Sequence, residues 1–188
     1  PRGGDFLYTD LEYDILRRDI DKCGECGVDG IVLGLLESSG GIDVERTGKL
    51  IESARPMSVT FHRAFDMCSD PEKGLEDVIS TGADRLLTSG QKNKAVEGTE
   101  LIRKLISQAK DRIIIMPGSG INELNIATVA KTTGAKEFHL TGRKVIESEM
   151  IFRRQNILSG GIPGISEYSR KVADPQMIRS IINILKLI

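Results

Sequence analysis

Five short apolar runs, each ending in small or polar residues, recur along this chain of 188 residues. Consecutive runs are about 24 to 28 residues apart, which is room for one strand, one helix and two short loops. A run that is apolar at successive positions is typical of a strand buried on both faces, as in a parallel sheet. The pattern therefore predicts a repeated strand–helix unit. The runs are residues 30–34, 59–62, 85–90, 113–118 and 137–142.

Helix start and stop signals fill the gaps between these runs. Thr9 and Glu12 match a capping box, in which each side chain serves a backbone N–H of the first turn. Asp70-Pro71 and Asp174-Pro175 each place a capping carboxylate before a proline at the first helical position. Glycine tolerates the left-handed conformation that ends many helices, and three glycines stand where helices are expected to end. They are Gly27, Gly82 and Gly134.

Strands that alternate with helices favour a parallel sheet with right-handed crossovers. Two architectures fit: a doubly wound open sheet, which gathers its site at one switch point, and a closed barrel. Polar residues end nearly every run, as the single active face of a barrel requires, so we predict a barrel. We expect one α/β domain over residues 1–188. It would be an incomplete (β/α)8 TIM barrel with about five of eight units, whose first strands would precede Pro1.

Composition excludes some classes of function. The 26 basic and 27 acidic residues give a net charge of −1 with no basic block, which disfavours nucleic acid and anionic membranes as partners. No apolar stretch reaches the roughly 18 residues of a spanning helix, and no signal peptide is visible. Three cysteines suit a reducing cytosol better than a disulfide scaffold, so we expect a cytoplasmic protein.

The segment Ser58–Asp66 is the densest in ionisable groups. Two-residue alternation sends His62 and Ala64 to one side of the expected strand and Arg63 to the other. His62 is a candidate general base or metal ligand, and Asp66 is within reach to orient the imidazole or to hold the guanidinium of Arg63. The alternative is a histidine satisfied by backbone groups beside a structural Arg63–Asp66 ion pair.

His139, the second histidine of the chain, also ends an apolar run. Two imidazoles on one rim can share a metal or divide acid and base roles, and a structural role is the alternative. The catalytic candidates are therefore His62, Asp66 and His139.

Glycine-rich turns follow the last two runs. In Gly118-Ser119-Gly120 and Thr141-Gly142, backbone N–H groups can converge on an anion, as the last loops of such barrels often do. The alternative is a tight turn that needs glycine for its geometry. The hydroxyls of Thr88 and Ser89 can add donors or can cap the next helix. Arg2 can bind a carboxylate or phosphate over the same rim, or can bind nearby carbonyls in its loop.

The cysteines suggest no metal site on their own. Cys23 and Cys26 fall at the end of an expected helix, where the dipole disfavours a thiolate, and no second pair completes a zinc site. This context argues against a redox role and against a zinc site. Cys68 with Met67 can form a soft Cu(I)-type site, whereas packing is the preferred role for Met67.

The C-terminal region carries two further features. Residues 159–164 are rich in glycine and can form a mobile lid or a loop, without a preference from the sequence. The last helix has a wide apolar stripe, which suits core packing better than an oligomer interface. Because an incomplete barrel exposes apolar edges, we expect a homo-oligomer. The stripe comprises Ile178, Ile181, Ile182, Leu185 and Ile188.

Segments 1–8, 59–66, 87–90 and 115–118 strongly resemble the CutC family, and the likeness extends to Ser169. The resemblance implies a cytoplasmic (β/α) barrel with a part in copper homeostasis and copper binding. Cu(I) would bind cysteines on the family's first strands, upstream of Pro1. Departures from the family pattern are Ser119, Thr141-Gly142 and Arg154. The rim residues that the resemblance carries over are Arg2, Asp5, His62, Arg63, Asp66, Thr88, Ser89, Gly118, Gly120 and His139.

A second hypothesis is an enzyme that acts on a small anionic metabolite. In it His62 or Asp66 is the general acid or base, and Arg2, Arg63 and the Gly118–Gly120 backbone bind the anion.

Overall fold

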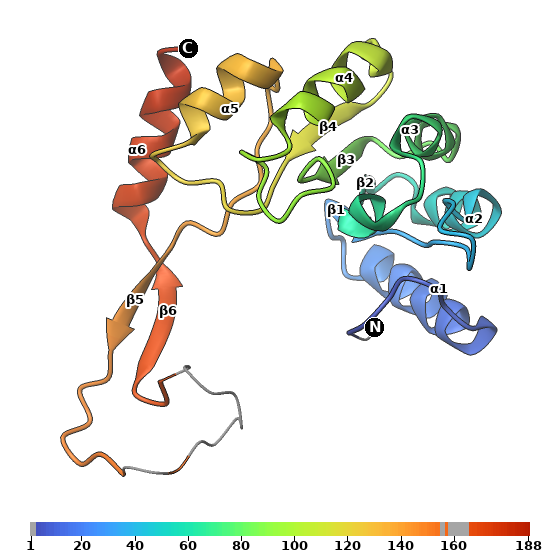
Figure 1. Cartoon of the computed structure of the whole chain (residues 1–188). Helices are drawn as coiled ribbons and strands as arrows, with labels where there is room; N and C mark the ends of the chain where they lie inside the picture. The colour runs from blue at the N-terminus through green and yellow to red at the C-terminus, as the bar shows by residue number, and fades with distance from the viewer. Residues whose placement is uncertain (1–2, 155–156, 158–165) are drawn as a thin grey trace.

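The structure, a computed structural model, describes residues 3–154, 157 and 166–188. Its body contains four parallel strands that lie side by side in chain order (Figure 1). A parallel bridge between Gly118 and His139 continues this row beyond the fourth strand. The predicted α/β fold of the TIM-barrel type is therefore confirmed, as part of a barrel. The strands are β1 (Gly30–Leu33), β2 (Ser58–Phe61), β3 (Arg85–Thr88) and β4 (Ile114–Pro117).

Helices connect successive strands, and their ends follow the local sequence signals. The capping box at Thr9 is formed, and the carboxylates of Asp70 and Asp174 cap the helices that begin at the following prolines. Gly134 ends its helix with a φ of +76°, a conformation that glycine adopts without strain. The α-helices are α1 (Asp10–Glu25), α2 (Val44–Ala54), α3 (Pro71–Ser80), α4 (Thr99–Ala109), α5 (Ile126–Thr133) and α6 (Pro175–Lys186).

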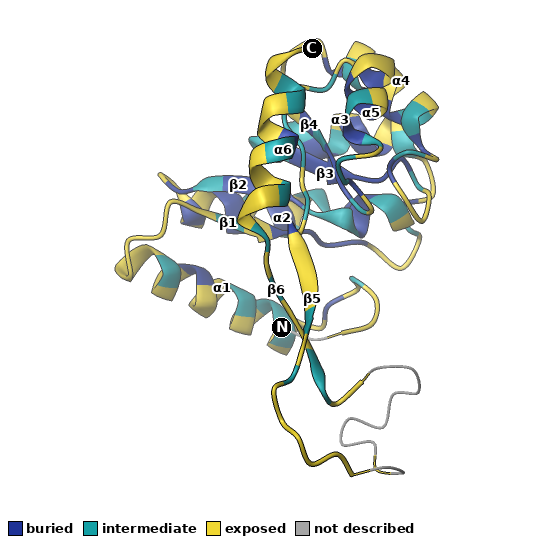
Figure 2. Cartoon of the chain, turned by 90° about the vertical axis from the view of Figure 1, so that its left-hand side faces the viewer, coloured by how far each residue is buried: buried dark blue, intermediate teal, exposed yellow. Residues whose placement is uncertain are grey.

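The core lies between the strands and the helices on one face of the sheet. Phe61 of β2 and Leu86 of β3 are fully buried there, together with Leu105 of α4. The opposite face is open only at its outer strands: Val32 of β1 is 62% exposed and Ile114 of β4 is 38% exposed, whereas Thr60 of β2 and Leu87 of β3 are 9% and 8% exposed. In Figure 2 the strands of the body are largely dark blue, that is buried, whereas the helices carry many yellow, exposed residues. Because the four strands are parallel, their carboxyl ends lie along one edge of the sheet.

One local expectation was wrong. Strand β2 ends at Phe61, so the two-residue alternation does not extend to Ala64. A short 3₁₀ helix, η1 (Arg63–Met67), follows, because Nδ1 of His62 accepts the N–H of Ala64 and its carbonyl accepts the N–H of Phe65. Ala64 is consequently fully buried.

A hairpin that the sequence did not suggest leaves the body after the fifth apolar run. Strand β5 (Arg143–Glu147) pairs antiparallel with β6 (Ser169–Ala173), and the two project away from the parallel sheet (Figure 1). The glycine-rich stretch 159–164 lies outside the described residues. None of the described helices combines the length and the apolar character that a membrane-spanning helix needs.

The last helix, α6, packs on the body through part of its apolar stripe. Ile181 is 3% exposed, whereas Ile178 and Ile182 are 39% and 46% exposed. These side chains and Phe138 border an apolar groove of about 370 Å³. Core packing therefore accounts for Ile181 and leaves the neighbouring isoleucines at the surface.

Thr47 of α2 provides a test of core packing. It is fully buried, and its hydroxyl oxygen has no hydrogen-bond partner among the described residues. A buried hydroxyl that has lost water without a partner costs about 1–3 kcal/mol. We therefore expect Thr47→Val to raise the free energy of unfolding, measured in urea, by about 1 kcal/mol. Thr128→Val, at an exposed position of α5, is the control, and equal shifts for the two variants would contradict the expectation.

Candidate functional site

The polar residues that follow β2, β3 and β4 meet at the carboxyl edge of the sheet. Strands β2 and β3 pair in parallel, so the segment after β2 lies beside the segment after β3. There η1 contacts the Thr88–Gln91 turn through a network of hydrogen bonds. Four of the predicted site residues are brought together in this way. They are Arg63, Asp66, Thr88 and Ser89.

Asp66 is the centre of this network. Its side chain is only 6% exposed. Four groups donate hydrogen bonds to its carboxylate: the Thr88 hydroxyl, the N–H groups of Ser89 (3.0 Å) and Gln91 (3.1 Å), and Nε of Arg63 (2.7 Å). The Ser89 hydroxyl lies 2.8 Å from the carboxylate as well, but its one proton is shared between Asp66 and the carbonyl of Lys92. Because a carboxylate has about four lone-pair positions, Asp66 is saturated with donors. This geometry favours a structural and positioning role over the acid–base role that the sequence left open.

Arg63 is held by these contacts with one side of its guanidinium toward solvent. Nε binds Asp66, and Nη2 donates to the hydroxyl of Ser89 (2.9 Å) and to the carbonyl of Lys92 (3.4 Å). The side chain remains 42% exposed. A guanidinium that is fixed on one edge and accessible on the other suits a carboxylate or phosphate ligand.

His62 lies on the open face of the sheet beside β1. Its Nδ1 accepts the N–H of Ala64 (3.2 Å), and its ring centroid is 4.9 Å from that of Phe6. A Cβ on Gly34 would lie 2.5 Å from Nδ1, so only glycine leaves room for the imidazole. Burial lowers the pKa of His62 from its ordinary value of 6.5. The neutral ring with Nδ1 as acceptor carries its proton on Nε2, and this atom is the one left for a ligand.

A cavity of about 320 Å³ lies next to this imidazole. It is mainly apolar, and its titratable side chains are those of His62 and Tyr8. The arrangement can bind a ligand that accepts a hydrogen bond from Nε2–H, or can deliver that proton as a general acid. The cavity is lined by Phe6, Tyr8, Leu16, Val32, Leu33, Gly34, Leu35 and His62.

His139 lies far from His62 along the rim. It is exposed, and its N–H donates to the carbonyl of Pro117 (2.9 Å). His62 follows β2, whereas His139 pairs beyond β4, so three strand spacings of about 4.8 Å each separate them along the sheet. That separation argues against one metal shared by both imidazoles. The described residues contain no group of three or more His, Cys, Asp or Glu side chains that could hold a metal ion.

The turn after β4 is occupied by internal contacts. The N–H of Gly118 donates to the carbonyl of Thr88 (2.9 Å), and a Cβ there would lie 2.4 Å from the Leu87 side chain. Ser119 has a φ of +80° and its hydroxyl donates to the carbonyl of Asn93 (2.7 Å). The Gly120 carbonyl accepts the amide of Asn125 (2.8 Å). The Gly118 N–H is thus used within the fold, and an anion cradle on the backbone of this turn stays a prediction.

The remaining candidates lie away from this cluster. Thr141 is exposed, and Gly142 joins the body to α6, because its carbonyl accepts the N–H of Asp174 (2.7 Å). Oδ1 of Asp5 accepts the N–H of Leu7 (3.2 Å) within the N-terminal loop. Arg2 lies outside the described residues.

The sulfur-containing side chains do not form a site that fits copper. Cys68 is buried and its thiol donates to the carbonyl of Asp70 (3.5 Å), and burial raises the pKa of this thiol to about 11. Met67 is 68% exposed, so the preferred packing role for it was wrong. The neighbours thus differ in exposure, because η1 turns Cys68 inward. Cys23 and Cys26 are free thiols in and just after the last turn of α1.

Sequence reasoning missed Gln91. Its N–H donates to Asp66, and its side-chain amide donates to the carbonyl of Cys68 (2.7 Å), so it ties η1 to the turn after β3. Gln91 has a φ of +57° and follows Gly90 in a polar turn. No residue pattern distinguishes it from other loop glutamines, so nothing in the sequence could have found it.

The lowered pKa of His62 predicts a pH dependence of stability. The unfolded chain takes up the proton on His62 more readily than the folded protein does. The free energy of unfolding therefore decreases as the pH falls through the pKa of His62 in the unfolded chain, and it stops decreasing below the pKa of His62 in the folded protein. We expect His62→Gln to flatten the urea stability profile between about pH 8 and about pH 5. His139→Gln, at the exposed histidine, should leave the slope unchanged. Equal slopes in all three proteins would contradict the assignment.

Together these features define a protein of the (β/α)-barrel class, with polar residues along the carboxyl edge of its sheet. The model of the CutC family matches residues 1–144. The chain is 47% identical over 182 residues to the family protein CutC of Parabacteroides distasonis, covering 97% of this chain and 75% of the relative. It is 45% identical over 186 residues to the human copper homeostasis protein cutC homolog, and the match covers 99% of this chain and 68% of the relative.

A solved structure gives the same result for the fold. The CutC structure from Streptococcus agalactiae superposes with a TM-score of 0.70 at 36% identity, covering 74% of this chain and 68% of that one. This chain belongs to the CutC family.

Proposed function

We propose that this protein takes part in copper homeostasis in the cytoplasm. The observation that carries the proposal is its 45% identity to the human and mouse relatives that are named copper homeostasis protein cutC homolog. The three free cysteines suit a reducing compartment, which supports the location.

The proposal assigns Cu(I) binding to soft sulfur ligands, because thiolates select Cu(I) over harder metal ions. The rim described above is not the proposed copper site, since Cys68 is buried and its thiol has a raised pKa. We propose instead that the ion binds cysteines of the kind that the resemblance gives to the first strands of CutC proteins.

Competition for Cu(I) with a chromogenic chelator tests this proposal. The CutC relative from Parabacteroides distasonis, of which this chain covers 75%, serves as the longer family member. We expect sub-micromolar Cu(I) binding by the relative and weaker binding by the present chain. Cys68→Ser should leave the binding curve of this chain unchanged. Binding by the relative that is micromolar or weaker would remove copper binding from the proposed role.

We propose a second candidate function, catalysis on a small anionic metabolite. One specific arrangement favours it: Asp66 fixes the guanidinium of Arg63 at the rim, and Nε2 of His62 is left for a ligand beside an apolar cavity. Arg63 would bind the carboxylate or phosphate, and His62 would donate a proton.

Thermal-shift measurements with phosphorylated and carboxylated metabolites test this second candidate. A ligand that binds the folded protein raises its melting temperature by mass action. We expect stabilisation that Arg63→Gln abolishes and that Arg17→Gln, at a half-exposed arginine of α1, preserves. No stabilisation by any ligand of these two classes would count against the candidate.

A further inference from the structure

The hairpin continues into an ordered segment that stands away from the body. We call residues 143–154 and 166–173 the arm. Beyond the paired strands, the N–H of Ser148 donates to the carbonyl of Tyr168 (2.7 Å), and the N–H of Arg154 donates to the Tyr168 hydroxyl (2.6 Å). The guanidinium of Arg153 stacks on the Tyr168 ring at 4.6 Å. The arm therefore has defined internal contacts without a core beneath it (Figures 1 and 2).

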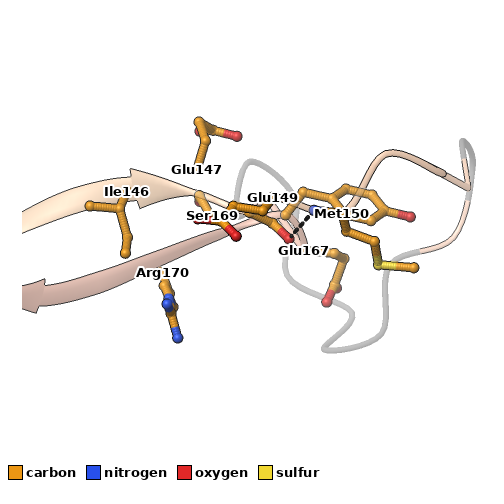
Figure 3. Close-up of a pocket in the computed structure, with 9 residues that line it drawn as sticks. Ile146, Glu147, Glu149, Met150, Glu167, Ser169 and Arg170 are labelled. Carbon is orange, nitrogen blue, oxygen red and sulfur yellow. Dashed lines mark hydrogen bonds between the residues drawn. The ribbon is translucent and has the colours of Figure 1, made fainter.

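Large apolar side chains are exposed along the arm. Ile151 is 97% exposed and Phe152 is 62% exposed, and Val145 and Met150 are exposed by 60% and 55%. Close to the end of the paired strands lies an open hollow of about 400 Å³ with a mixed lining, in which Glu147, Glu149 and Glu167 accompany Met150 and Arg170 (Figure 3). Met150, Ile151 and Phe152 are consecutive in the chain, and exposed apolar side chains grouped in this way are typical of an interaction site.

The arm also carries an excess of positive charge. Its basic residues outnumber its acidic residues two to one, although the whole chain has a net charge of −1. A partner of opposite charge is therefore favoured, and pairing of two arms with each other is disfavoured by repulsion. The basic residues are Arg143, Lys144, Arg153, Arg154, Arg170 and Lys171, and the acidic residues are Glu147, Glu149 and Glu167.

Helix α1 has the complementary surface. Its acidic residues outnumber its basic residues two to one. Leu11 and Ile15, one turn apart, are 73% and 45% exposed, and Asp19 continues the same line one turn further. The acidic residues of α1 are Asp10, Glu12, Asp14, Asp19, Asp21 and Glu25, and the basic residues are Arg17, Arg18 and Lys22.

We propose that the arm of one copy of this chain docks on α1 of a second copy. Ile151 and Phe152 pack on the Leu11–Ile15 stripe, and Arg154 faces Asp19 across the contact. The exchange is reciprocal, so one two-fold axis relates the copies and both contacts form together. Apolar contact supplies the affinity, and the opposite charges set the orientation and make association depend on salt.

Sedimentation velocity over a range of protein concentrations tests the proposal. We expect wild type to form a dimer that weakens as salt rises, and Phe152→Glu to weaken dimerisation at least tenfold. Leu124→Glu, at a leucine of the body that is 94% exposed, is the matched control and should dimerise as wild type does. A wild type that is monomeric at every concentration, or equal loss of dimer in the two variants, would overturn the proposal.

A charge exchange identifies the contacting surfaces. Arg154→Glu and Asp19→Lys each place like charges in both contacts of a homodimer, so each variant alone is expected to be monomeric. Mixing the two variants restores opposite charges in both contacts, and a heterodimer is expected. If the mixture stays monomeric while wild type dimerises, the arm does not dock on α1.

Discussion

Replacing Asp66 by asparagine is expected to lower the free energy of unfolding by about 3 kcal/mol or more. The carboxylate is 6% exposed and accepts hydrogen bonds from η1 and from the turn after β3, including the N–H groups of Ser89 and Gln91. An asparagine keeps the shape, removes the charge and turns an NH₂ group toward donors. Urea unfolding followed by circular dichroism measures the loss as a lower midpoint at unchanged slope.

Arg63→Gln is the matched comparison for this prediction. Arg63 belongs to the same ion pair, but its side chain is 42% exposed. Water can therefore take over many of the hydrogen bonds that are lost when Arg63 is replaced. We expect its removal to cost less than about 1 kcal/mol. An Asp66→Asn protein that unfolds at the wild-type urea concentration would show that the carboxylate does not hold η1 to β3. The acid–base role predicted from the sequence would then be favoured.

The fold was predictable because its signals are local and repeated. Runs of successive apolar residues are typical of parallel strands, and four of the five runs form strands, although Val32 and Ile114 leave one face of the outer strands exposed. The fifth forms a single bridge, from His139 to Gly118. The run lies at the end of the row, and its alternate positions are polar. Helix ends were predictable for the same reason, since the capping side chains are near neighbours in the sequence.

The arm could not be predicted from the same kind of signal. Strands β5 and β6 pair residues as far apart as Arg143 and Ala173, so no turn residue fixes their register. Neither strand is deeply buried, because no layer covers the ribbon, and their charged residues hide the alternation that marks a half-buried strand.

The sequence predicts which residues share the rim of the sheet, but not which hydrogen bonds they form with one another. Parallel strands bring their carboxyl ends to one edge, so the sequence predicts that Asp66, Thr88 and Ser89 belong to one rim, whereas it relates Asp66 only to His62 and Arg63. The number of donors to one carboxylate depends on how the 3₁₀ turn and the Gln91 loop fold together. That is a non-local property, so the sequence left the catalytic and structural roles of Asp66 open.

Gly90→Ala is expected to lower the free energy of unfolding by roughly 2–4 kcal/mol. Gly90 has a φ of +69°, and a Cβ there would lie 2.3 Å from the backbone carbonyl oxygen of Gly98, which cannot move aside as a side chain can. The N–H of Gly90 also donates to the hydroxyl of Thr88, which itself binds Asp66. The substitution therefore strains both the N-terminus of α4 and the network at the rim.

Gly27→Ala separates the two contributions to this loss, the left-handed backbone conformation and the close contact with Gly98. Gly27 has the same φ of +69°, but a Cβ there has no atom within 4 Å. Its substitution should cost only the left-handed conformation, about 1–2 kcal/mol, and the difference between the variants measures the contact with Gly98. Urea denaturation of both variants beside wild type gives that difference directly. Equal losses would mean that the turn after β3 relaxes away from α4, and that close approach of Gly90 to Gly98 is not required for the rim to form.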